Sequence, residues 1–132
     1  MRQRLGRSVD PYFEKLDALC AKITSFGNLP TGWDGEEAVP PPQAVLGTAC
    51  KLVREMPREA ELPSVAPAPD GEIGLTWVNG PKQLNAMLHT DYHLVWVKRL
   101  EENGRFLPGA EIDLSVENYP RQFVEEVTAL YK

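Results

Sequence analysis

The chain has 132 residues, of which 42% are hydrophobic and 25% charged, an ordinary balance for a soluble globular protein. Fourteen basic and nineteen acidic residues give a net charge of −5, which argues against non-specific nucleic-acid binding because phosphate contacts need a basic patch. Neither a membrane span of roughly 20 apolar residues nor a signal peptide is expected. We expect one cytoplasmic domain over residues 1–132, with residues 1–8 as a polar, basic lead. The acidic balance leaves room for a basic protein partner or for nucleic-acid mimicry.

Two amphipathic helices are predicted in the first half of the chain. Asp10-Pro11 is a typical helix start, with Asp10 as the cap and proline in the first turn, where a missing donor does no harm. Gly27 is expected to end this helix. A second helix begins at Pro42 or Gln43 and stops at Pro57. Its interior Gly47 costs stability on the order of 1 kcal/mol relative to alanine, which close packing against another element would explain.

Cys20 and Cys50 are the two cysteines, one on the apolar stripe of each helix. In a cytosolic chain they are expected to be reduced and buried. The sequence contains no CxxC pair, so it gives little support to a zinc site or a thioredoxin-type redox site.

The segment between the helices carries two glycines around Trp33-Asp34, which predicts a tight turn with backbone angles that other residues avoid. Trp33, Asp34 and Gly35 are interpreted as a structural loop. In this loop Trp33 buries its ring against the core and Asp34 accepts backbone hydrogen bonds. The alternative is an acidic site for a metal-dependent hydrolase or nuclease-like enzyme, built from Asp34, Glu36 and Glu37. No EF-hand spacing supports that alternative.

A run of hairpins follows the second helix. Asn79-Gly80 and Asn103-Gly104 lie between alternating apolar and polar residues, a strong hairpin signal, and Thr90-Asp91 marks a further break. The predicted strands are 72–78, 83–89, 92–101 and 105–114, with a short edge strand at 64–66 and a third helix capped by Asn118. The predicted fold is therefore two-layer α+β in the order α-α-(β)-β-β-β-β-α, a four- to five-stranded antiparallel meander packed on two to three helices.

Strand register assigns each side chain to one face of this sheet. We assume a four-residue loop at 79–82 and two-residue loops at 90–91 and 103–104. The resulting core face consists of Ile73, Leu75, Trp77, Leu84, Ala86, Leu88, Val95, Val97, Ala110, Ile112 and Leu114. The opposite face combines Thr76, Asn85, Lys98, Glu111 and Asp113 with an apolar group, Met87, Tyr92, Leu94 and Trp96.

That opposite face is the predicted partner-binding site, with Met87, Tyr92, Leu94 and Trp96 as its apolar part and Glu111 and Asp113 as its polar rim. The alternatives are that a loop or helix of the same chain covers the apolar group, or that the register is wrong. The functional hypothesis is a small non-catalytic protein-interaction module of the antitoxin, inhibitor or accessory type. It binds a protein partner or a second copy, with no cofactor and no metal.

Little catalytic chemistry is evident. GxGxxG, Walker and GxSxG motifs are missing. The assumed register points His89 and His93 to opposite faces, so the two are not expected to share a metal. His89 with Asp113 or Glu111 is kept as a possible acid–base pair.

Two motifs carry a resemblance to known proteins. The first is Leu29-Pro30-x-Gly32-Trp33-Asp34-Gly35-x-x-Ala38, and the second is Pro69-Asp70-Gly71-Glu72-Ile73-x-Leu75-x-Trp77. In this order, over residues 29–77, they resemble small bacterial proteins with no assigned activity. The resemblance implies a bacterial, cytoplasmic accessory protein from mobile or defence-related gene neighbourhoods, and it assigns no catalytic residue.

Overall fold

A computed structural model describes residues 10–117 and 119–132. The basic lead at 1–8 and the predicted cap Asn118 lie outside these residues. The described elements are α1 (Pro11–Ser25), the short 3-10 helix η2 (Phe26–Asn28), α2 (Gln43–Arg54), β1 (Ser64–Pro67), β2 (Ile73–Asn79), β3 (Lys82–Leu88), β4 (His93–Arg99), β5 (Leu107–Asp113) and α3 (Arg121–Leu130).

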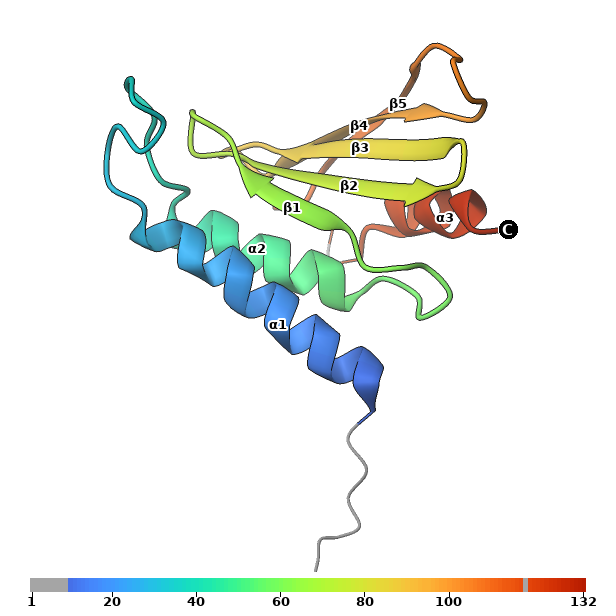
Figure 1. Cartoon of the computed structure of the whole chain (residues 1–132), viewed down its shortest axis with the longest axis horizontal. Coiled ribbons are helices and arrows are strands. Elements are labelled where there is room, and N and C mark those ends of the chain that lie inside the picture. Colours follow the sequence, from blue (N-terminus) through green and yellow to red (C-terminus); the bar gives the residue numbers. More distant parts are fainter. Residues whose placement is uncertain (1–9, 118) are drawn as a thin grey trace, which may run out of the picture.

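The strands form one antiparallel sheet in the order β1-β2-β3-β4-β5. All three α-helices lie on the same side of this sheet, with α1 packed on α2 (Figure 1). The predicted α+β class and meander are thus confirmed. No helix in the described part of the chain is long and apolar enough to cross a membrane.

Local sequence accounts for the helix starts. The Asp10 carboxylate accepts a hydrogen bond from Tyr12 N at 2.9 Å, as predicted for a cap, and Pro11 occupies the first turn. The explanation offered for Gly47 is wrong, because this glycine is exposed on α2 and a Cβ added there would meet nothing within 4 Å.

The predicted register of the first hairpin is confirmed. Trp77 pairs with Leu84, Leu75 with Ala86 and Ile73 with Leu88. All six side chains are buried, because the pairing places them together on the face that the helices cover.

The second hairpin departs from prediction by one residue. Leu88 pairs with Leu94 and Ala86 with Trp96, where pairing with His93 and Val95 was expected. The reason is a longer turn: Tyr92 N donates to His89 O at 2.9 Å, and Tyr92 adopts a left-handed φ of 70°. This is the three-residue hairpin whose last loop position is left-handed. Such a position normally takes glycine or asparagine, so the tyrosine at position 92 does not indicate a three-residue turn in the sequence.

The third hairpin contains a second one-residue shift. Leu94 pairs with Ile112 and Val95 with Glu111, and a bulge lies between Val95 and Val97. Each shift moves side chains to the other face of the sheet, so the shift between β3 and β4 and the shift between β4 and β5 cancel for β5. Ile112 therefore keeps its predicted face, and the side chains of β4 point to the face opposite the predicted one.

Leu94 and Trp96 are therefore core residues, 0% and 2% exposed, and their predicted placement on an outer surface is wrong. The Trp96 ring packs edge-on against Phe123 of α3 at 4.9 Å, and Trp77 packs on the same phenyl ring at 5.3 Å. Lys98 also lies on the helix side, where its ammonium pairs with Glu126 at 2.8 Å. Val95 and Val97, predicted as core, take the opposite face.

Candidate functional site

The side of the sheet opposite α1, α2 and α3, which we call the outer face, is organised in rows across the strands. Pairing places Ala66, Gly74, Met87, Val95 and Glu111 in one row. The next row consists of Ser64, Thr76, Asn85, Val97 and Pro108. Met87, Val95 and Val97 are half-buried among their neighbours on this face. Together the three form an apolar centre on the side of the sheet away from the described helices (Figure 1).

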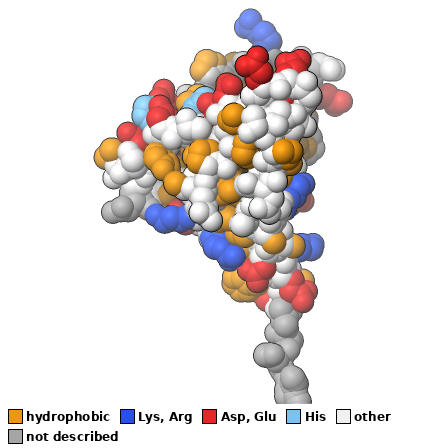
Figure 2. All heavy atoms as spheres, turned by 90° about the vertical axis from the view of Figure 1, so that its left-hand side faces the viewer, with side chains coloured by type: hydrophobic (Ala, Val, Ile, Leu, Met, Phe, Trp, Pro, Cys, Tyr) orange, Lys and Arg blue, Asp and Glu red, His pale blue; other side chains and the backbone are white. Residues whose placement is uncertain are grey.

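One end of the outer face is a row of ionisable residues. Glu72 precedes β2, His89 follows β3, and His93 pairs with Asp113 across β4 and β5. Backbone geometry holds the row together, since His89 N donates to His93 O at 2.9 Å. Figure 2 shows the two histidines beside acidic side chains on the surface.

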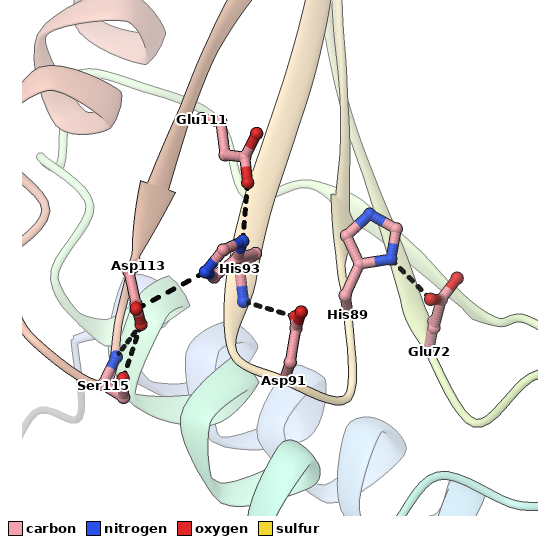
Figure 3. Close-up of polar contacts among 7 residues, drawn as sticks. All are labelled: Glu72, His89, Asp91, His93, Glu111, Asp113 and Ser115. Carbon is pink, nitrogen blue, oxygen red and sulfur yellow. Dashed lines mark hydrogen bonds and ion pairs between the residues drawn. The ribbon is translucent and has the colours of Figure 1, made fainter.

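His93 lies between two carboxylates (Figure 3). Its Nδ1 is 2.5 Å from Glu111 Oε2 and its Nε2 is 3.4 Å from Asp113 Oδ2. The hydrogen bond with Glu111 is the main cause that raises the pKa of His93 above its usual value, and the charges of Asp91 and Asp113 add to it. An imidazole donates from both nitrogens only when protonated, so this arrangement favours the imidazolium.

The carboxylates around His93 are themselves held in place. Asp113 Oδ1 accepts from Ser115 N at 2.9 Å and from Ser115 Oγ at 2.5 Å. These bonds are the main cause that lowers the pKa of Asp113. Asp91 Oδ1 accepts a hydrogen bond from His93 N at 3.1 Å (Figure 3). This bond stabilises the β3–β4 turn beside His89 and His93.

His89 does not form the pair that was considered for it as an alternative. Its Nδ1 lies 2.5 Å from Glu72 Oε2 (Figure 3), whereas Glu111 and Asp113 contact His93. The alternative of a His89 pair with Asp113 or Glu111 is therefore wrong. His89 and Glu72 could orient a proton transfer, but the Ser115 hydroxyl is bonded to Asp113 and not to either histidine.

The ion pairs of His93 predict the direction in which its pKa is shifted. We expect its pKa, measured by NMR of the ring protons, to exceed the usual value of about 6.5 and to fall in Glu111→Gln, which removes the main acceptor. Because the folded state favours the imidazolium, the stabilisation is fully present below the unfolded-state pKa. It disappears as pH rises through the raised value. A His93 that titrates at or below its usual value in the parent protein would contradict this geometry.

The structure divides the six residues predicted to bind a partner. Met87, Glu111 and Asp113 lie on the outer face, and Tyr92 lies in the β3–β4 turn. Leu94 and Trp96 lie beneath the sheet in the core. The sequence analysis did not assign Glu72, His93, Val95 or Val97 to this site. The face of the three β4 residues, His93, Val95 and Val97, follows from their alternation only once the left-handed turn at Tyr92 is known.

The predicted structural loop is partly as expected. Asp34 Oδ1 accepts from Glu36 N at 2.9 Å and Ala38 N at 3.3 Å, as predicted for a carboxylate that stabilises its own turn. Gly32 and Gly35 adopt φ values of 78° and 87°, the left-handed angles expected of them. The loop packs beside the second motif, since Val39 N donates to Pro69 O at 2.9 Å.

The predicted core contact of Trp33 is wrong. The ring is half-buried and is not among the residues that form the core or pack against it. Trp33 Nε1 donates to Val39 O at 3.2 Å, so the residue closes its own loop instead. Asp34, Glu36 and Glu37 are all exposed, and within residues 10–117 and 119–132 no group of three or more His, Cys, Asp or Glu residues could hold a metal ion.

Comparison with protein-family models, curated proteins and solved structures finds no match for this chain. The geometry itself defines a small two-layer α+β protein whose sheet is covered by helices on one side. The other side presents an apolar centre next to a row of histidines and carboxylates.

Proposed function

We propose that this protein is a non-catalytic binding module that docks a basic protein partner on the outer face of its sheet. The observation that carries the proposal is the position of Met87, Val95 and Val97 at the centre of the sheet face opposite the described helices. An antiparallel sheet with one solvated face normally shows polar residues there. An apolar centre with a polar border is the usual anatomy of a protein-binding surface.

The charge beside this centre favours a basic partner. Glu72, Asp91, Glu111 and Asp113 supply four carboxylates around the two histidines. Even with a protonated His93, the row stays negative, and the chain as a whole carries a charge of −5. Complementary charge accelerates encounter and selects among partners. The same charge would oppose the approach of a second copy by this end.

The apolar centre and the charged row both contribute to the binding energy. Met87, Val95 and Val97 are half-buried, so covering their remaining apolar surface, at about 25 cal/mol per Å², yields a modest gain. Association consumes much of this gain, so complementary charge is needed for useful affinity. Binding is therefore expected to weaken as salt concentration rises.

The decisive test is a pair of charge-matched variants. Val95→Lys places a cation at the apolar centre and opposite Glu111, whereas Val116→Lys makes the same charge change at a residue that is 74% exposed and outside the sheet. Each immobilised protein is incubated with native lysate, and retained proteins are quantified by mass spectrometry. We expect a protein of net positive charge to be retained by the parent and by Val116→Lys, and reduced at least tenfold by Val95→Lys.

Two outcomes would overturn the proposal. Equal retention by the two variants would mean that the outer face is not the binding surface. Light scattering that shows a dimer of the parent, lost in Val95→Lys, would assign the face to a second copy of the chain. Far-UV circular dichroism of both variants confirms that each is folded before binding is compared.

A further inference from the structure

The two cysteines face each other where α1 and α2 pack together. Cys50 Sγ donates to Cys20 O at 3.6 Å, and Cys20 Sγ donates to Cys50 O at 3.9 Å. Each thiol therefore lies against the backbone of the other cysteine. Both are free thiols in the structure, and the positions on two packed helices bring residues 30 apart in sequence into contact.

The surroundings of the two thiols are unequal. Cys20 is buried at 7% exposure, whereas Cys50 is half-buried. Burial, with the neighbouring Cys50, raises the pKa of Cys20 to about 11. The guanidinium of Arg54, held by Asp17 at 3.1 Å, interacts with both sulfurs. Cys50 is the more accessible thiol of the pair.

We propose that Cys50 and Cys20 form an oxidisable dithiol, in which a peroxide converts the pair into an intramolecular disulfide between α2 and α1. The Cys50 thiolate attacks one oxygen of hydrogen peroxide, the O–O bond breaks, and the departing hydroxide takes a proton to become water. The resulting Cys50 sulfenic acid is attacked by the Cys20 sulfur, which gives up its proton. The S–O bond breaks, and hydroxide leaves with that proton as a second water.

The overall change is balanced: two thiols and one peroxide give one disulfide and two waters. Cys20 acts as the resolving thiol because it is shielded from solvent but adjacent to Cys50. The bond would join α1 to α2, its packing partner in the helix layer (Figure 1). It would also close the chain segment that contains the Trp33-Asp34 loop. This inference is independent of the proposed outer-face binding.

The test treats the full chain with hydrogen peroxide and analyses a non-reduced digest by mass spectrometry. We expect one cross-linked peptide pair containing Cys20 and Cys50, with a whole-protein mass lower by two hydrogen atoms. The melting temperature should rise on the order of 5 °C, because the link restricts the unfolded chain, and dithiothreitol should reverse the rise. Cys50→Ser should leave Cys20 unmodified. Cys20→Ser should stop at a Cys50 sulfenic acid that dimedone traps, and Cys20→Ala serves if the serine variant does not fold.

Three results would contradict the proposal. In the first, Cys50 gains two or three oxygen atoms in the parent while Cys20 stays reduced. In the second, the disulfide joins two chains, seen as a dimer on a non-reducing gel. In the third, both thiols of the folded parent survive peroxide that oxidises the same thiols in the denatured protein.

Discussion

Trp96→Lys is expected to unfold the protein, whereas Val95→Lys, one residue away, should leave it folded. Trp96 is 2% exposed and packs on Phe123. Truncating such an aromatic residue alone costs about 3–5 kcal/mol, and burying an unpaired charge adds to this. Val95 points to the outer face opposite Glu111, where a lysine finds solvent and a carboxylate.

Circular dichroism and chemical denaturation of the two variants measure this difference. The total stability of a domain of this size is about 5–15 kcal/mol, so the Trp96 substitution removes most or all of it. A folded Trp96→Lys together with an unfolded Val95→Lys would contradict the observed register and show that Val95 faces the core. Val95 and Val97 would then not lie on the outer face.

Gly109→Ala should destabilise the protein by about 1–3 kcal/mol or more, the usual cost of overpacking. A Cβ at Gly109 would overlap the Trp96 indole and come within 2.6 Å of Trp96 O. The second contact is with backbone, so a rotamer change cannot relieve it, and the β4–β5 bulge must move. Thermal and urea unfolding of the variant measure the loss.

Gly74→Ala is the matched control for this substitution. Gly74 is also a strand glycine, but the nearest atom to an added Cβ is 3.8 Å away, an ordinary contact. We expect this variant to be as stable as the parent or slightly more stable, since alanine in a strand restricts the unfolded chain. Equal stability of Gly109→Ala and Gly74→Ala would show that β5 does not approach Trp96 as closely as described.

Most of the fold was predictable because its signals are local. Asp10-Pro11 predicts the first helix, and the Asn79-Gly80 hairpin places Trp77 opposite Leu84, as observed. These features depend on a few neighbouring residues with strong backbone preferences. The element order and sheet topology follow from them.

The faces of β4 were not predictable from the same reasoning. The register of each strand depends on the length of the turn before it. One extra loop residue at Tyr92 moves every side chain of β4 to the opposite face of the sheet. The compensating bulge between Val95 and Val97 then returns β5 to its expected face. Tyrosine rarely adopts a left-handed conformation, so the sequence favours the shorter turn. The packing of Leu94 and Trp96 in the core outweighs that preference.

The candidate site was predictable only in part for the same reason. Glu111 and Asp113 were assigned to the correct face because the predicted faces of β5 agree with the structure at these positions. The pairing of His93 with both carboxylates required the observed register, which brings His93 opposite Asp113. The loop at Asp34 was easier, since an aspartate between glycines accepts hydrogen bonds from its own turn.

The most direct test of the outer face as a binding surface is site-specific photo-cross-linking. A photoreactive phenylalanine analogue is placed at Val97, on the outer face, or at Val116, outside the sheet. Each protein is irradiated in native lysate at low and high salt. We expect an adduct with a basic protein from position 97 that high salt abolishes, with no such adduct from position 116. The absence of an adduct from position 97, or the same adduct from both positions, would contradict it.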